Sequence, residues 1–107
     1  MKEMKIKLLT DTATVPMRAT EGSAGYDLRA DIKEAHVLGK GEIFAVPTGI
    51  AIALPDKNYV AVVCARSGLA IKHGISLANG VGIIDSDYRG EIKVGLINSG
   101  EEDFVIN

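Results

Sequence analysis

The feature that most constrains this chain is a set of short segments in which apolar and polar residues alternate with a period of two. Ile6 and Leu8 alternate with two lysines, and similar patterns recur over residues 50–54 and 92–96. Such alternation predicts strands with one buried face. Only residues 67–73, with Ser67 as a candidate N-cap, are predicted to form a helical turn, because no ten-residue stretch keeps a period of 3.6.

The composition supports the same fold class. The chain has 107 residues, and 12 Ile and 9 Val stand against 8 Leu, which favours pleated strands over helices. Clusters of Gly, Pro, Asn and Ser separate the apolar segments at short intervals, as in sandwiches, barrels and jelly rolls. We therefore predict one all-β domain over residues 1–107, a jelly-roll-like sandwich or barrel.

Charge and cysteine content exclude several functional classes. The formal net charge of −2 argues against a nucleic-acid partner, and no apolar stretch is long enough to span a membrane. The charged N-terminus does not resemble a secretory signal, so a cytoplasmic location is expected. The single cysteine, Cys64, lies in an apolar run and is predicted to be a small buried hydrophobe.

Common nucleotide and calcium motifs are absent from the sequence. No P-loop pattern occurs, and Gly80-Val81-Gly82 is followed by Asp85 where a dinucleotide-binding loop needs another glycine. The segment that starts at Asp85 has leucine where a calcium loop needs its twelfth-position glutamate. The sequence therefore fits neither a P-loop, nor a dinucleotide-binding loop, nor a calcium loop.

Three segments concentrate glycine, carboxylate and hydroxyl groups. The first, residues 24–30, is predicted to be a strand that carries Asp27, either as a solvated outward residue or as a carboxylate near a metal ion or its water. The second, residues 65–70, contains Arg66, Ser67 and Gly68 where a strand meets a helical turn. Backbone N–H groups, a hydroxyl and a guanidinium there suit a phosphate, although a capped turn with a surface arginine is the simpler alternative.

The third segment, residues 79–90, is predicted to be two strands joined by a tight turn at Ser86-Asp87. Gly80 and Gly82 leave room for a flat ligand against the backbone, whose N–H and C=O groups can imitate the edge of a nucleobase. Asp85 follows two isoleucines, a setting in which a carboxylate can orient a water molecule. A plain β-hairpin with the aspartates as turn formers is the alternative.

These segments together resemble three ordered motifs of the trimeric dUTP diphosphatases (dUTPases). The motifs are residues 24–28 (Ala-Gly-Tyr-Asp-Leu), 66–70 (Arg-Ser-Gly-Leu-Ala) and 82–90 (Gly-Ile-Ile-Asp-Ser-Asp-Tyr-Arg-Gly). The related dCTP deaminases are less similar, because they have a second serine after Arg-Ser and Pro-Gly after the third-motif aspartate. The resemblance implies a β-clip homotrimer that hydrolyses dUTP to dUMP and pyrophosphate with Mg²⁺, limiting uracil incorporation into DNA and supplying dUMP for dTMP synthesis.

The resemblance also implies a role for each matching residue. Asp85 would orient and deprotonate the attacking water, and Tyr88 would lie against the deoxyribose where a 2′-hydroxyl would clash. The matched uracil-reading positions are Asn79, the backbone of Gly82, Ile83 and Ile84, and Lys93; the matched triphosphate-binding positions are Arg66, Ser67 and Gly68. Asp27 would hold Mg²⁺ through water.

One departure leaves the function open between two classes. The chain ends at residues 104–107, where the family continues into a fourth motif and a flexible arm that closes over the nucleotide. Loss of such an arm is expected to reduce turnover more than base recognition. A non-catalytic dUTP- or dUDP-binding module is therefore the alternative to an active hydrolase. We also expect Val60, Val62 and Val94 as candidate residues of a subunit interface.

Overall fold

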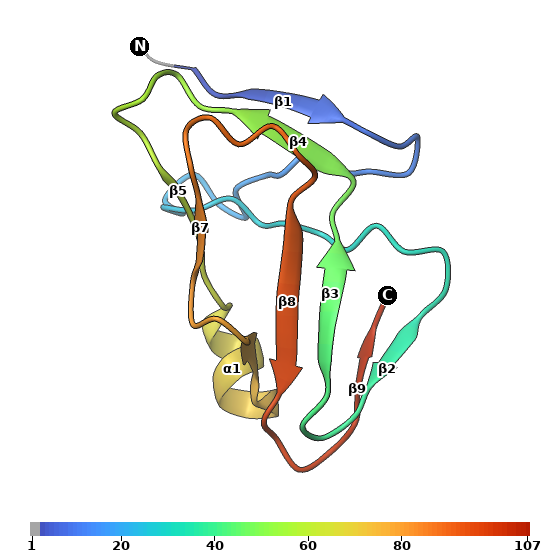
Figure 1. Ribbon diagram of the computed structural model, residues 1–107. Helices are drawn as coiled ribbons and strands as arrows, with labels where there is room; N and C mark the ends of the chain where they lie inside the picture. The colour runs from blue at the N-terminus through green and yellow to red at the C-terminus, as the bar shows by residue number, and fades with distance from the viewer. Residues whose placement is uncertain (1–2) are drawn as a thin grey trace.

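The structure, a computed structural model, describes residues 3–107, and its regular elements are short antiparallel strands and one short helix, joined by long turns and loops (Figure 1). In chain order the elements are β1 (Lys5–Leu8), β2 (His36–Leu38), β3 (Ile43–Pro47), β4 (Ile50–Ala53), β5 (Ala61–Val63), α1 (Ser67–His73), β6 (Ile75–Leu77), β7 (Gly82–Ile84), β8 (Lys93–Asn98) and β9 (Phe104–Ile106). The predicted all-β fold is confirmed. No helix within residues 3–107 is long and apolar enough to cross a membrane.

The strands form four small antiparallel sheets. Strand β8 lies between β3 and β6 in the one three-stranded sheet, while β1 pairs with β4, β2 with β9, and β5 with β7. In Figure 1, β5 and β7 run along one side of the molecule, and β2 and β9 along the other. The other three sheets are therefore two-stranded ribbons, and within residues 3–107 no further strand pairs with their outer edges.

Two clusters of aliphatic side chains form the core. One contains Leu38, Val46, Ile75 and Ile106, and the helix α1 packs against it through Leu69. The other contains Ile50, Ile52 and Ile92, with Ile84 and Val94 packed against it. The second cluster supports β7 and the loop after it, which together carry the third motif.

The joint between β3 and β4 is held tightly. Gly49 has a φ of 70°, and a Cβ atom there would overlap the carboxylate of Asp31 and lie 2.8 Å from the Cβ of Ala13. The neighbouring Thr48 is buried, and its hydroxyl donates a hydrogen bond of 2.6 Å to the backbone oxygen of Ile92. Only glycine fits at position 49, because its surroundings exclude a side chain and its φ is left-handed.

Several local predictions are corrected. Residues 24–30 do not form a strand, because Asp27 makes only an isolated antiparallel bridge with Met17. The N-cap of α1 is Arg66 rather than Ser67, and no side chain caps this helix. Cys64 is exposed rather than buried, since the alternation that turns Val63 towards the interior turns residue 64 outwards.

Candidate active site

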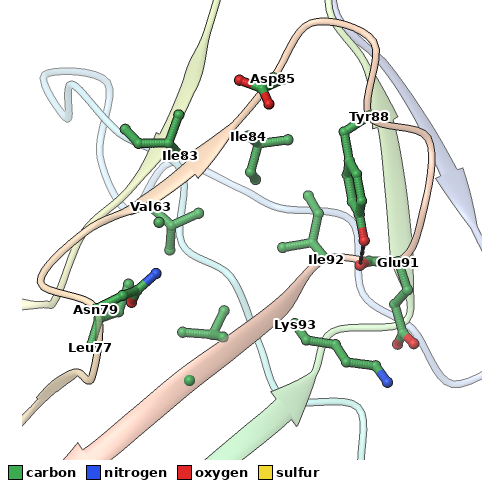
Figure 2. A pocket seen from close by; sticks show the side chains of 13 residues that line it. Val63, Leu77, Asn79, Ile83, Ile84, Asp85, Tyr88, Glu91, Ile92 and Lys93 are labelled. Atoms are coloured by element: carbon green, nitrogen blue, oxygen red, sulfur yellow. Dashed lines mark hydrogen bonds between the residues drawn. The ribbon is translucent and has the colours of Figure 1, made fainter.

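The third motif forms one wall of a pocket between β7 and β8 (Figure 2). Residues 79–90 do not form the two strands predicted on either side of Ser86-Asp87, because they contain one strand, β7, which pairs with β5. The next strand, β8, has both edges occupied by β3 and β6. The chain from Ile84 to Lys93 therefore connects two strands that are not hydrogen-bonded to each other. The space between them has a volume of about 490 Å³, within the range of about 300–1,000 Å³ that is typical of small-molecule sites.

The pocket brings together seven of the residues predicted for the site. They are Asn79, Gly82, Ile83, Ile84, Asp85, Tyr88 and Lys93. These residues come from the turn before β7, from β7 itself, from the following turn and from the start of β8. The predicted base-reading, sugar-contacting and water-orienting residues thus share one cavity.

Six further lining residues were not predicted: Val63, Leu77, Glu91, Ile92, Val94 and Gly95. Two of them had a signal in the sequence. Gly95 interrupts an alternating strand, and glycine inside a strand often marks the close approach of a ligand. Glu91 directly follows the third motif. The others depend on strand pairing, as Val63 does by lying opposite Gly82.

Backbone hydrogen bonds shape the turn that carries Asp85. The N–H of Tyr88 donates to the backbone oxygen of Asp85 at 3.1 Å, which confirms the predicted turn at Ser86-Asp87. Arg89 donates from Nη1 to the backbone oxygens of Ser86 at 2.8 Å and Tyr88 at 3.2 Å. The Asp85 carboxylate is exposed to solvent, whereas Ile84 before it packs against the core. The carboxylate is thus anchored through its backbone and remains accessible.

The strand β7 offers backbone groups to the pocket. Within residues 3–107 it pairs only with β5, so its other edge carries N–H and C=O groups that no strand uses. A bound planar heterocycle can satisfy such groups in place of a neighbouring strand. At the entrance to this strand, the Gly80 N–H donates to the Leu77 backbone oxygen at 3.0 Å and so shapes the turn that presents Asn79.

The remaining predicted site residues lie outside this pocket. Asp27, Arg66 and Ser67 line a second, broad recess, and the Nε of Arg66 lies 3.9 Å from Oδ1 of Asp27. Gly68, in the first turn of α1, lines neither recess. The two recesses share an apolar wall but not their polar groups, so one chain does not unite the predicted phosphate cradle with Asp85.

The carboxylate of Asp27 fits one kind of metal contact. Among residues 3–107, no group of three His, Cys, Asp or Glu side chains is arranged to hold a metal ion. Mg²⁺ commonly keeps several waters and takes other ligands from substrate phosphates, with only one or two protein carboxylates. The Asp27 side chain, 35% exposed beside Arg66, is compatible with such a phosphate-bound ion.

Two carboxyl groups outside the pocket, those of Asp31 and Glu42, have lowered pKa values. Hydrogen bonds from the hydroxyls of Thr10 and Thr12 lower the pKa of Asp31. A hydrogen bond from the Gly39 N–H lowers the pKa of Glu42, and a weaker contribution in the same direction comes from its hydrogen bond with the His36 side chain. Both carboxylates hold neighbouring segments of the chain by hydrogen bonds, and neither lines the pocket.

The fold is that of an all-β protein with a pocket at an open strand edge, and comparison with known proteins identifies its family. A model of the dUTPase family matches residues 11–107. The deoxyuridine 5′-triphosphate nucleotidohydrolase of Neisseria meningitidis serogroup A is 54% identical over 106 residues, which cover 97% of this chain and 71% of that relative. This chain belongs to the dUTPase family.

Two solved structures support the fold. A mutant dUTPase from phage phi11 of S. aureus, described with a coordinated structural Mg(II) ion, has a TM-score of 0.80 at 28% identity and covers 92% of this chain and 61% of its own. A mutant dUTPase of Staphylococcus bacteriophage 80alpha with dUpNHpp has a TM-score of 0.78 at 28% identity, covering 92% and 56%. The chain therefore spans less than two thirds of these solved chains.

Proposed function

We propose that this protein hydrolyses dUTP to dUMP and pyrophosphate, with the pocket between β7 and β8 holding the nucleoside. The observation that carries the proposal is the convergence of Asp85, Tyr88 and the open edge of β7 on one cavity of nucleoside size. The free edge of β7 would pair with the uracil, helped by Asn79 and Lys93. Tyr88 would lie against the deoxyribose and leave no room for a 2′-hydroxyl.

Asp85 would act as the general base. Its exposed carboxylate stands at the end of β7, where it can accept a proton from a water molecule directed at the α-phosphorus. Arg66, Ser67 and Gly68 would bind the phosphates, and Asp27 would hold Mg²⁺ through water. The ion, when bound, supplies charge neutralisation for the leaving pyrophosphate. Positioning of water and phosphate then accounts for most of the catalysis.

We also propose that the working form is a homotrimer. The phosphate-binding residues and Asp85 lie in different recesses of one chain, and a neighbouring subunit could bring them together. Val60 and Val62 are 53% and 51% exposed, which supports their burial between subunits, whereas Val94 packs against the core of its own chain. Light scattering should give three times the subunit mass of 11.3 kDa, and a mass of one subunit would contradict the trimer.

Nucleotide specificity gives the direct test of the activity. The protein is incubated with dUTP, UTP or dCTP and Mg²⁺, and pyrophosphate and ammonia are measured. Pyrophosphate from dUTP alone is expected. Ammonia from dCTP would instead indicate a deaminase.

A non-catalytic dUTP- or dUDP-binding module is the second candidate. It is favoured by the separation, within one chain, of the recess that contains Arg66 from the pocket that contains Asp85. Tight dUDP binding in calorimetry without pyrophosphate release would select it. Absence of both binding and turnover would contradict both functions.

A further inference from the structure

The ring of Tyr88 is folded back over its own turn and is held there by the next residues in the chain. Its hydroxyl donates a hydrogen bond of 2.9 Å to the backbone oxygen of Glu91 (Figure 2). A Cβ atom on Gly90 would lie 2.6 Å from that hydroxyl oxygen and 2.8 Å from the ring carbon that bears it. The ring can occupy this position only because residue 90 has no side chain.

Glu91 is itself attached to the β3–β4 joint. Its Oε2 accepts a hydrogen bond of 3.0 Å from the N–H of Gly49, which lies 42 residues away in the sequence. The next residue, Ile92, donates from its N–H to the Ile50 backbone oxygen at 2.9 Å, and its own oxygen accepts from Thr48. Thr48, Ile50 and Ile92 are all buried. The acceptor of the Tyr88 hydroxyl is therefore fixed to the core.

This attachment matters because Tyr88 is otherwise a surface residue. Its side chain is 46% exposed, and an unrestrained exposed tyrosine samples several rotamers. Discrimination against one hydroxyl group requires the ring to stay close to a fixed position, since a ring that moves aside makes room for the larger sugar. The ordered acceptor restrains the ring beside the pocket, and the missing Cβ at residue 90 leaves that position free for it.

We propose that Gly90 and Glu91 are positioning residues that hold the Tyr88 ring and thereby determine the preference for deoxyribose over ribose. The proposal rests on the proposed binding of uracil nucleotides in this pocket. Gly90 provides the space for the ring, and Glu91 provides the acceptor and connects it to Gly49. Neither residue needs to touch the nucleotide for this role.

The test compares variants at both positions. Gly90→Ala pushes the ring away, and Glu91→Ala removes the bond to Gly49, whereas Glu91→Gln keeps an acceptor oxygen and is the conservative rescue. Glu34→Ala removes an exposed carboxylate outside the pocket and is the matched control. Thermal unfolding of each variant is measured so that loss of folding is not read as loss of selectivity.

Two measurements are made on each folded variant. The first is NMR of the chain carrying ¹³C-labelled tyrosine, without nucleotide, in which the Tyr88 ring signal is assigned by its loss in Tyr88→Phe. The second is the dissociation constant for dUDP and for UDP with Mg²⁺ by calorimetry. For Gly90→Ala and Glu91→Ala we expect a shifted ring signal and a loss of about fivefold to tenfold in the dUDP preference, the scale of one hydrogen bond. Glu91→Gln and Glu34→Ala should keep the wild-type values.

The outcomes separate this inference from the proposed function. An unshifted ring signal in both Gly90→Ala and Glu91→Ala, or a shifted signal with an unchanged dUDP preference, would overturn the inference while leaving uracil-nucleotide binding intact. A wild-type chain that binds neither nucleotide would overturn the proposed function and the selectivity role with it. The ring signals would still decide whether Gly90 and Glu91 hold Tyr88.

Discussion

Replacement of Asp85 by asparagine tests the proposed catalytic base. The change keeps the size of the side chain, and the backbone oxygen of residue 85 still accepts the Tyr88 N–H. Because the side chain is exposed, we expect the free energy of unfolding to change by no more than about 0.5 kcal/mol. The carboxylate is nevertheless lost, and with it the group that would accept the proton of the attacking water.

The expected kinetic effect follows from that loss. A positioned acid–base group contributes a factor of about 10² or more, which corresponds to at least about 2.7 kcal/mol of the activation free energy. Binding of dUDP should persist, since the uracil-reading and sugar-contacting groups are unchanged. The turnover of Asp85→Asn should therefore fall at least about a hundredfold, with little change in nucleotide affinity.

The assay is a single-turnover reaction with the protein in excess over dUTP, so that slow turnover is still measurable as dUMP formed. Asp87→Asn is the matched control, because Asp87 belongs to the same exposed turn but does not line the pocket. Its rate should stay within about twofold of wild type, the scale of a small surface change. Equal rates for wild type and Asp85→Asn, or equal losses in both variants, would refute the reasoning.

Three other predictions concern specificity, packing and pH. Tyr88→Ala should raise the kcat/KM of UTP relative to dUTP by about tenfold or more, as measured by pyrophosphate release, and an unchanged ratio would place the discrimination elsewhere. Asn98 is fully buried and donates to two backbone carbonyls, so Asn98→Ala should lower the free energy of unfolding by about 2–4 kcal/mol in urea, and a loss below about 1 kcal/mol would contradict its structural role. Asp31 and Glu42 have pKa values below their unfolded ones, so the stability they contribute is complete above the unfolded pKa values, near 4, and is lost as the pH falls through the folded ones. Urea unfolding between pH 7 and pH 3 should show this loss, and Asp31→Asn should show less of it.

Local sequence determined several features of the protein directly. The strands at residues 5–8, the helical turn at 67–73 and the tight turn at Ser86-Asp87 all lie where they were predicted. Side-chain alternation, turn residues and motif spacing act over a few residues and need no information about distant parts of the chain. The same short segments carried the dUTPase resemblance, which the family match over residues 11–107 confirms.

Tertiary structure alone decided which strands pair and which faces are covered. The second strand predicted within residues 79–90 is wrong, because the chain after Ser86-Asp87 continues as a loop to β8. β7 pairs instead with the distant β5, and β8 pairs with β3 and β6, which leaves the pocket between β7 and β8. In the same way Cys64 turned out exposed and Val94 partly buried, since alternation gives two faces without saying which one meets the core. The link from Glu91 to Gly49 spans 42 residues, so no local pattern could reveal it. Side-chain alternation is a local property of the chain, whereas strand pairing and burial depend on the free energy of the whole set of contacts.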